Sequence, residues 1–303
     1  GWERGARSLY DTREYEITVT GSSSRLLDRE IATHLRGRAV KHLLLPFSFR
    51  EYLMCRNVDV PSHLSARSAA LVKNHLLRWL ESGGYPEVVQ ARDDAEGIKI
   101  VDGYRELLVY RDIVERYRIR SPFIVKLLID LLINNFAKEF SVNHYHQILK
   151  SRGIRVDRKT LYSHLSHVED SLTLFLLERW SPKLKEQRLA PKKVYLCDNA
   201  LAYRSREEVG RLMENAVFLE LKRIQNLRPW VELSYWKDHQ PREVDFVLKN
   251  GRRVTHLIQV THSTGRDDLK DREIANILAG RGELRCRNLS VITWETERVE
   301  RID

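Results

Sequence analysis

The chain has 303 residues, of which 42% are hydrophobic and 31% charged, and its formal net charge is +10. This length is sufficient for two or three domains with apolar cores, and the composition is that of a globular chain. The longest apolar stretch, residues 123–133, is interrupted by Lys126 and Asp130. It therefore falls short of the roughly 18–20 apolar residues of a membrane span and predicts a buried helix.

The cysteines and the first residues indicate the cellular compartment. Cys55, Cys197 and Cys286 are widely spaced and form no Cys-x-x-Cys pair, which favours reduced thiols over disulfides or a zinc ribbon. The opening residues, GWERGARSLY, contain no basic-then-apolar export signal. We therefore expect a cytoplasmic protein that does not bind membranes.

The first two regions predict an αβ fragment followed by helices. Residues 1–57 contain an alternating strand at 15–21 (YEITVTG), a helix at 26–35 and an apolar run at 39–53. Residues 58–117 show helical periodicity at 66–84 and 99–117, with GGYPEV as the break between them. The second region therefore predicts a small helical domain.

The third region, residues 118–203, predicts three helices and a hairpin. The helices lie within 121–140, 141–153 and 157–171, with Ser141 and Asp157 as N-caps of the last two, and the hairpin strands lie within 172–181 and 192–198. This order is typical of a winged helix, whose last helix enters the DNA major groove.

Charge and residue type predict a DNA interface in this region. Residues 118–193 hold 15 Lys and Arg against 7 Asp and Glu, so most of the positive excess lies here. Phosphate contacts are expected from the start of the last helix and base contacts from its middle, at Arg155, Arg158, Lys159, Tyr162, Ser163 and His167. The alternatives are an interdomain module and a solvated basic face.

The fourth region, residues 204–303, predicts an αβββαβ domain. A long amphipathic helix at 206–226 precedes strands at 231–237, 243–249 and 255–261, and a helix at 268–280 precedes a last strand at 288–295. The order is that of an α+β or α/β domain of about 100 residues.

Acidic and polar residues on neighbouring strands of this domain indicate a metal site. Asp245 lies on one strand, and Gln259 and Thr261 lie two residues apart on the next, so they share a face. Glu214 on the first helix completes a shell of the oxygen ligands that Mg²⁺ prefers. Two alternatives to this metal site remain open. Glu220 could take the place of Glu214, and Asp245 could form a salt bridge with Arg242 or Arg253 instead of binding a metal ion.

The motifs EN..FLEL, YW, EVDFVL and LIQVT, in αβββαβ order, resemble the restriction-endonuclease-like PD-(D/E)XK fold. More closely, they resemble the C-terminal domain of unknown function of archaeal and bacterial AAA+-type ATPases. The stretch TVTGSSS to LPFSFREYL is similar to the segment after the Walker B strand of that family. The resemblance implies an AAA+ core part at 1–57, a helical lid at 58–117, a winged helix at 118–203 and a nuclease-like domain at 204–303.

The same resemblance implies roles for single residues. Thr20 to Ser24, with Ser22 and Ser23 at the centre, would form the sensor-1 strand end near the γ-phosphate of ATP. Arg38, or less readily Arg36, would be an arginine finger acting on a second copy, which implies self-association. Glu214, Asp245 and Gln259 would form the metal shell, with Mg²⁺ at Asp245.

Two differences from the family pattern limit these roles. None of the 14 glycines is followed by lysine, so the chain has no Walker A motif, and we expect ATP binding only in a longer form that carries it. The acid-x-lysine of the nuclease motif is Gln259-Val260-Thr261 here, so the site lacks one carboxylate and its lysine. Lys222 or Lys270 is a candidate for a relocated lysine.

The sequence therefore predicts a multidomain α/β protein of an ATPase family. It would bind DNA through the basic winged helix and carry a degenerate nuclease-like domain. The alternatives are an active Mg²⁺-dependent nuclease with a relocated lysine and a protein-docking or oligomerisation module that does not bind DNA.

Overall fold

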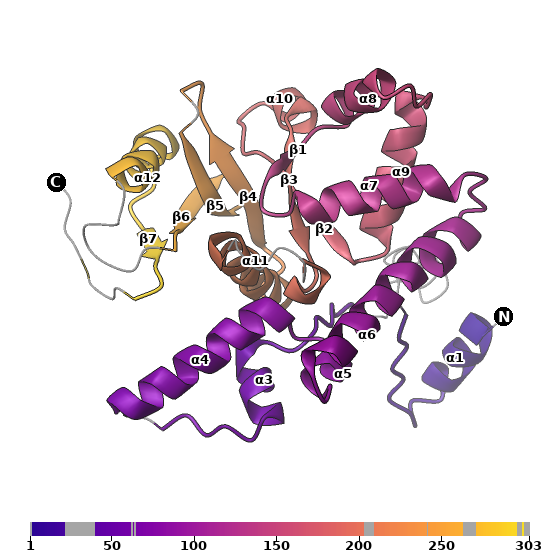
Figure 1. The fold of residues 1–303 in the computed structure, drawn as a ribbon, viewed down its shortest axis with the longest axis horizontal. Coiled ribbons are helices and arrows are strands. Elements are labelled where there is room, and N and C mark those ends of the chain that lie inside the picture. Colours follow the sequence, from indigo (N-terminus) through magenta and orange to yellow (C-terminus); the bar gives the residue numbers. More distant parts are fainter. Residues whose placement is uncertain are drawn as a thin grey trace.

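The computed structural model describes residues 2–21, 40–61, 63, 65–202, 209–240, 242–262, 271–295 and 299. Helices surround two small sheets, and α1 lies on the opposite side of the molecule from the last strand (Figure 1). The fold is thus mixed α/β, as the sequence predicts.

The N-terminal part differs from the prediction. Helix α1 (Trp2–Asp11) was not expected, and residues 15–21, predicted as a strand, have no regular secondary structure. No strand of the described residues pairs with this segment, and a strand needs a neighbour to satisfy its backbone groups. Helix α3 (Phe49–Cys55) begins at a capping box between Ser48 and Glu51. Ser22, Ser23, Arg36 and Arg38 lie outside the described residues.

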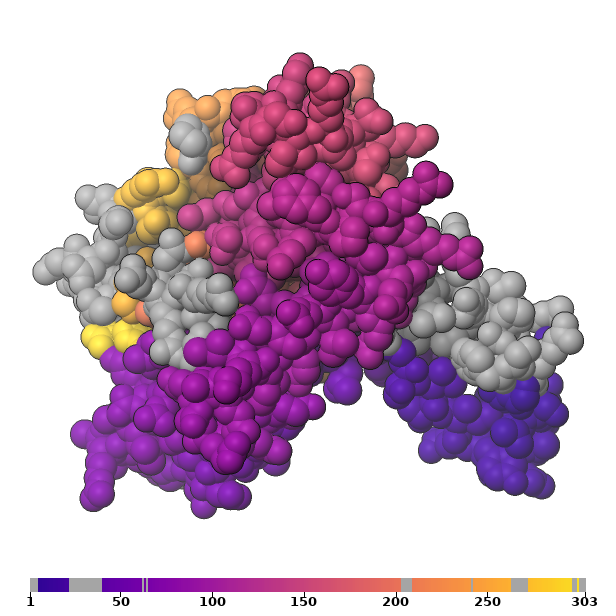
Figure 2. All heavy atoms as spheres, turned by 45° about the vertical axis from the view of Figure 1, so that its right-hand side comes forward, coloured from indigo at the N-terminus to yellow at the C-terminus, as the bar shows by residue number. Residues whose placement is uncertain are grey.

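The predicted helical region is confirmed. Helix α4 (Ala66–Ser82) ends at Gly83 and buries Trp79 and Leu80, after which the short α5 (Pro86–Val89) leads into α6 (Asp94–Leu107). A π-helical segment, η2 (Leu108–Glu115), continues α6 directly. Figure 2 shows these helices as one continuous surface from which α1 stands apart.

The three predicted helices and the predicted hairpin are present in the middle part: α7 (Pro122–Asn134), α8 (Val142–Ser151), α9 (Arg158–Asp170), β2 (Leu174–Leu177) and β3 (Lys192–Leu196). A short strand, β1 (Glu139–Phe140), stands where the end of the first helix was predicted, because α7 ends at Asn134. The strands form a sheet in the order β1-β3-β2, and the short α10 (Leu184–Leu189) lies between β2 and β3. Ser141 caps α8 as predicted, whereas Asp157 stands at the N-cap of α9 without a side-chain cap bond.

The C-terminal part has the predicted αβββαβ order. Its elements are α11 (Val209–Leu227), β4 (Val231–Lys237), β5 (Glu243–Asn250), β6 (Arg253–Val260), α12 (Asp271–Leu284) and β7 (Leu289–Ile292). The sheet order is β4-β5-β6-β7, antiparallel except for the parallel β6–β7 pair. Parallel pairing requires a crossover connection, and α12 lies in it.

The middle and C-terminal parts are packed as one body. One cluster of buried apolar side chains spans both parts, running from Tyr52 in α3 to Val260 in β6 with α11 at its centre (Figure 1). A second, smaller cluster, which includes Trp236 and Ile277, lies within the C-terminal part. Backbone bonds also join the two sheets: Trp180 N donates to Tyr235 O at 2.6 Å and Tyr235 N donates to Glu178 O at 3.1 Å. Among the helices described, none is both long and apolar enough to cross a membrane.

Candidate functional site

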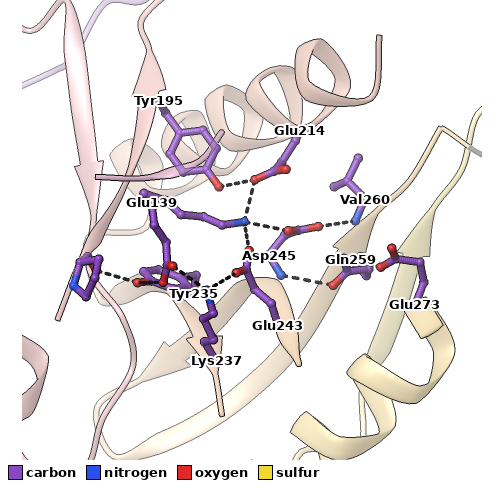
Figure 3. Close-up of polar contacts among 12 residues, drawn as sticks. Glu139, Tyr195, Glu214, Tyr235, Lys237, Glu243, Asp245, Gln259, Val260 and Glu273 are labelled. Atoms are coloured by element: carbon purple, nitrogen blue, oxygen red, sulfur yellow. Dashed lines mark hydrogen bonds and ion pairs between the residues drawn. The ribbon is translucent and has the colours of Figure 1, made fainter. Parts of the chain in front are cut away.

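A buried lysine stands at the meeting point of three carboxylates. Lys193 Nζ lies 2.9 Å from Glu214 Oε1, 2.6 Å from Glu243 Oε1 and 2.9 Å from Asp245 Oδ1. Figure 3 shows the three acids pointing toward one place from α11 and β5. Only 3% of the Lys193 side chain is exposed, so its ammonium is enclosed by the acids. We call these four residues the lysine–acid cluster.

The local fold explains how these residues meet. Side chains two positions apart in a strand share a face, so β5 presents Glu243 and Asp245 together, and β3 presents Lys193 with Tyr195. Tyr195 lies flat against Phe218 of α11, with ring centres 4.1 Å apart. This stack holds β3 against the helix that carries Glu214.

Burial and charge set the protonation of the lysine–acid cluster. Burial, followed by the nearby charge of Asp245, raises the pKa of Glu214 to about 7. Burial would lower the pKa of Lys193, but Asp245 and Glu214 together outweigh it and hold that pKa well above the ordinary 10.5. Tyr195 Oη also donates to Glu214 Oε1 at 2.7 Å. The lysine is therefore a permanent cation at neutral pH.

Asp245 and Gln259 are tied together through the backbone. The second oxygen of Asp245 accepts from Val260 N at 2.9 Å, and Asp245 N donates to Gln259 Oε1 at 3.3 Å. Gln259 Nε2 donates to Glu273 Oε2 of α12 at 2.9 Å. Both ends of the glutamine amide are thus engaged away from Lys193, and Gln259 acts as a link between β5, β6 and α12.

A second layer of polar contacts surrounds the lysine–acid cluster. Tyr235 Oη lies 2.9 Å from Glu139 Oε1 and 2.6 Å from Pro191 O, two acceptors that share its single hydroxyl hydrogen. Lys237 Nζ lies 2.5 Å from Glu139 and 3.6 Å from Glu243. The layer joins β4 to β1, so the polar contacts at this point also fasten the middle part to the C-terminal part.

The structure decides between the alternative partners of the predicted residues. Glu214 contacts Lys193 together with Asp245, whereas Glu220 is half exposed and pairs with Arg223 at 2.8 Å. Arg242 pairs with Asp238 at 2.6 Å instead of with Asp245. The cation beside Asp245 is Lys193 instead.

Neither lysine that the sequence suggested as a relocated catalytic lysine is found in the lysine–acid cluster of the described structure. Lys222 points into a different cavity, where its ammonium lies over the ring of Phe175, and Lys270 lies outside the described residues. Sequence reasoning missed Lys193 and Glu243. The sequence pattern could have indicated Glu243, because it lies two residues before Asp245 on the same strand and so shares its face. It indicated Lys193 more weakly, as a charged residue within the apolar strand KKVYL.

The lysine–acid cluster does not fit a bound Mg²⁺ as it stands. The carboxylates converge on the lysine ammonium, and a metal ion would have to displace it. Across the residues that the structure describes, no group of three or more His, Cys, Asp or Glu side chains is arranged to hold a metal ion.

The predicted DNA-contacting residues lie just before α9 and along it, from Arg155 to His167 in its last turn. Arg155, Arg158 and Lys159 are exposed, and Tyr162 is 52% exposed. His167 is half-buried and stacks on Tyr117, with ring centres 3.7 Å apart. The first four residues therefore present a basic and aromatic surface to solvent, while His167 presents only part of its ring.

Three family models match the chain: an AAA domain over residues 1–53, a domain of unknown function (DUF8612) over residues 73–207 and a domain of unknown function (DUF4143) over residues 209–300. The uncharacterized protein MJ1544 of Methanocaldococcus jannaschii is 34% identical over 309 residues, which cover 99% of this chain and 67% of that protein. An uncharacterized protein of Haemophilus influenzae is 26% identical over 264 residues, which cover 85% of this chain and 62% of that protein. No solved structure matches the chain.

Proposed function

The chain belongs to the same family as MJ1544 of Methanocaldococcus jannaschii, and from this premise we propose that it is the DNA-binding part of an AAA-type ATPase. In this proposal residues 1–57 belong to the ATPase core, 58–117 form a lid, 118–203 a winged helix and 204–303 a PD-(D/E)XK-like domain. The C-terminal domain binds or supports the DNA complex and does not cut DNA.

The observation that carries the loss of cutting is the position of Lys193. A nuclease of this type needs a metal ion to stabilise the charge of the transition state and to activate water. Lys193 places a fixed positive charge within 2.9 Å of Glu214, Glu243 and Asp245. Its cation neutralises the acids but cannot activate water as a metal ion does, so the domain keeps the shape of a nuclease without its chemistry.

The same contact supports a second candidate, an active nuclease in which Lys193 is the relocated lysine. A catalytic lysine must face the phosphate that reacts. Lys193 Nζ instead contacts three carboxylates, and its side chain is almost fully buried. The non-cutting domain is therefore the better supported of the two.

Binding of DNA is proposed through α9. The order α7, β1, α8, α9, β2, β3 is that of a winged helix, and the start of α9 exposes Arg155, Arg158 and Lys159 with Tyr162 beside them. Strand β3 of the wing is buried against α11, so in this proposal α9 makes the DNA contacts of this region.

Nucleotide chemistry belongs to a longer form in this proposal. Ser22, Ser23 and Arg38 would sense and complete an ATP site whose phosphate loop is not in this sequence, and Arg38 would act between copies in a self-associated ATPase. The chain by itself is proposed to bind DNA without turning over ATP.

The experiment for DNA binding uses a matched pair of double variants. Arg158→Ala with Lys159→Ala is expected to weaken binding to labelled duplex DNA about tenfold and to lower the slope of log affinity against log salt by about 2, because two phosphate contacts are lost. Arg67→Ala with Lys99→Ala removes the same charge from exposed positions on α4 and α6. This control is expected to bind like the parent chain.

Fluorescence anisotropy at several salt concentrations measures both quantities. Equal affinity of the α9 variant and the parent chain would contradict the proposed interface. Equal loss in both variants would mean that only overall charge matters. No binding by the parent chain would favour the docking-module alternative.

A further inference from the structure

The turn between η2 and α7 carries basic side chains outside α9. Residues 116–120, with the sequence RYRIR, include three arginines, and all three are exposed. We call these five residues the arginine turn. Residues 111–121 together hold four arginines against two acids, Asp112 and Glu115. The turn is therefore a basic surface, and it lies apart in the sequence from the basic start of α9.

The backbone of the arginine turn is fixed by hydrogen bonds. Arg118 N donates to Glu115 O at 3.2 Å and Ile119 N donates to Val114 O at 2.9 Å, a pattern that ends many helices. Arg118 has a φ of 51°, in the left-handed region that glycine usually occupies at this position. Backbone strain of this kind gathers at functional sites. An exposed arginine thus stands where glycine would cost less.

Two of the three arginines are unpaired in the part of the chain that the structure describes. Arg116 lies 3.8 Å from Asp112, whereas Arg118 and Arg120 have no carboxylate within ion-pair distance there. An arginine presents several N–H donors that match the oxygens of a phosphate. Arg118 and Arg120 can therefore bind an external phosphate without first giving up a partner.

The arginine turn lies beside the last turn of α9, where the chain enters α7 (Figure 1). Tyr117 stacks on His167 with ring centres 3.7 Å apart, and Tyr117 Oη donates to Asp170 Oδ2 at 3.0 Å. Arg158 and Lys159 are exposed at the opposite end of α9. Basic surfaces therefore stand at both ends of this helix.

The spacing of the two basic surfaces matches the width of a DNA groove. Lys159 and His167 are eight residues apart, so at a rise of about 1.5 Å per residue they lie about 12 Å apart along the helix. The major groove is also about 12 Å wide and is edged by the phosphates of one strand on each side. Tyr162 and Ser163 are exposed between the two surfaces and would face the bases.

We propose that Arg118 and Arg120 bind phosphates of one DNA strand while Arg158 and Lys159 bind phosphates of the other, so that α9 is held in the major groove from both ends. This inference rests on the proposed binding of duplex DNA through α9, and it adds a contact outside that helix. Phosphate contacts fix the position of a protein on the duplex without reading its sequence. The arginine turn is therefore a positioning element of the interface.

The first test measures binding of the full chain to a random-sequence duplex at several salt concentrations. The turn variant, Arg118→Gly with Arg120→Ala, is expected to bind about tenfold more weakly and to lower the slope of log affinity against log salt by about 2. Glycine suits the backbone at position 118, so this variant is expected to melt no lower than the parent chain. Weaker binding is then not a consequence of unfolding.

Combination with the α9 variant, Arg158→Ala with Lys159→Ala, tests whether the two surfaces act together. Their losses are expected to add, to about a hundredfold weaker binding and a slope lower by about 4, because the two pairs are well separated. Arg67→Ala with Lys99→Ala is the matched control, and it is expected to bind like the parent chain.

A duplex with one neutral strand tests the assignment of the surfaces to different strands. When methylphosphonate replaces every phosphate of one strand, the protein can turn around and place either surface on the charged strand. The turn variant and the α9 variant are then each expected to bind within about twofold of the parent chain, since one phosphate-binding surface suffices. Full loss in each variant on this duplex would place both surfaces on one strand and overturn the assignment.

The outcomes separate this inference from the proposed function. If the turn variant keeps the affinity and salt slope of the parent chain while the α9 variant binds more weakly, the arginine turn has no role and the interface on α9 stands. If the parent chain does not bind duplex DNA, or the α9 variant binds like it, the proposed function fails and this inference fails with it. Equal loss in the turn variant and the control also overturns the inference, because overall charge then explains binding.

Discussion

Replacement of Lys193 by methionine is expected to destabilise the fold by about 3–5 kcal/mol, the range for removing one partner of a buried ion pair. The change leaves Glu214, Glu243 and Asp245 facing one another without a cation. Urea denaturation followed by circular dichroism measures the loss. Lys192→Met is the matched control, because Lys192 is more exposed and pairs with Glu178 at 3.3 Å, a contact worth about 0–1 kcal/mol.

The loss should depend on pH in a defined direction. In the parent chain the pKa of Glu214 is already raised from 4.5 to about 7. A raised pKa means that the folded state holds the proton more tightly than the unfolded state, so stability from this group is full below pH 4.5 and falls as pH rises through about 7. Without Lys193 the acids repel more strongly. The variant should therefore lose more stability at alkaline than at acidic pH.

Two further variants separate charge from packing. Asp245→Asn in the Lys193→Met background removes one of the crowded charges and is expected to recover part of the lost stability. Lys193→Ala makes room between the acids, and Mn²⁺ is expected to stabilise this variant but not the parent chain. Equal stability of Lys193→Met and the parent chain would show that the lysine is not needed to neutralise the acids.

Replacement of Gly83 by alanine is expected to cost about 3–5 kcal/mol, the sum of backbone strain and overpacking. Gly83 has a φ of 79°, and a Cβ atom there would lie 1.8 Å from Asp198 Oδ1 and 2.5 Å from Ala200 N. Asp198 is fixed in place because it accepts from Gly84 N at 2.7 Å and Ala200 N at 2.8 Å. The Cβ atom could be accommodated only if the backbone at Ala200 or the carboxylate of Asp198 moved, which would break these hydrogen bonds.

Gly103→Ala is the matched control for this variant. Gly103 lies inside α6, and a Cβ atom there would meet nothing within 4 Å. Alanine should therefore stabilise the helix by up to about 1 kcal/mol. Thermal unfolding of both variants measures the contrast, and a Gly83→Ala protein as stable as the parent chain would contradict the geometry at this joint.

The contact at Gly83 is part of a joint between the helical, middle and C-terminal parts. Asn199 Nδ2 donates to Leu80 O of α4 and to Leu212 O of α11. Asn215 of α11 donates to Asn199 Oδ1 at 2.9 Å and exchanges bonds with the backbone of Leu196 in β3. These hydrogen bonds hold the end of α4 to the middle part and to α11. A displacement of the helical part relative to them would strain or break these bonds.

The sequence predicted best what depends on local pattern. Helices α4, α6, α7, α8, α9 and α11 follow from apolar periodicity, and the αβββαβ order follows from the alternation of strands and helices. The strand at residues 15–21 was wrong, because a strand forms only beside a partner and the described residues provide none. Local pattern alone carries no information about that neighbour.

The site was predicted in part for a similar reason. Glu214 and Asp245 both contact Lys193, and Gln259 accepts a hydrogen bond from the backbone N–H of Asp245, because their positions on the helix and strands fix the faces on which they lie. Lys193 lies 21 residues before Glu214, in a different sheet from Asp245. The position of Lys193 between the acids depends on how β3 packs on α11. This packing forms only in the assembled core, so local sequence pattern does not predict it.

The most direct measurement is an assay of the full chain with labelled single- and double-stranded DNA in Mg²⁺, Mn²⁺ or EDTA, beside an Asp245→Ala control. Duplex DNA is expected to be bound and to remain uncut under all three conditions, because the Lys193 ammonium already neutralises Glu214, Glu243 and Asp245. Metal-dependent cleavage that disappears in the Asp245→Ala control would contradict it and would make Lys193 the relocated lysine of a working nuclease.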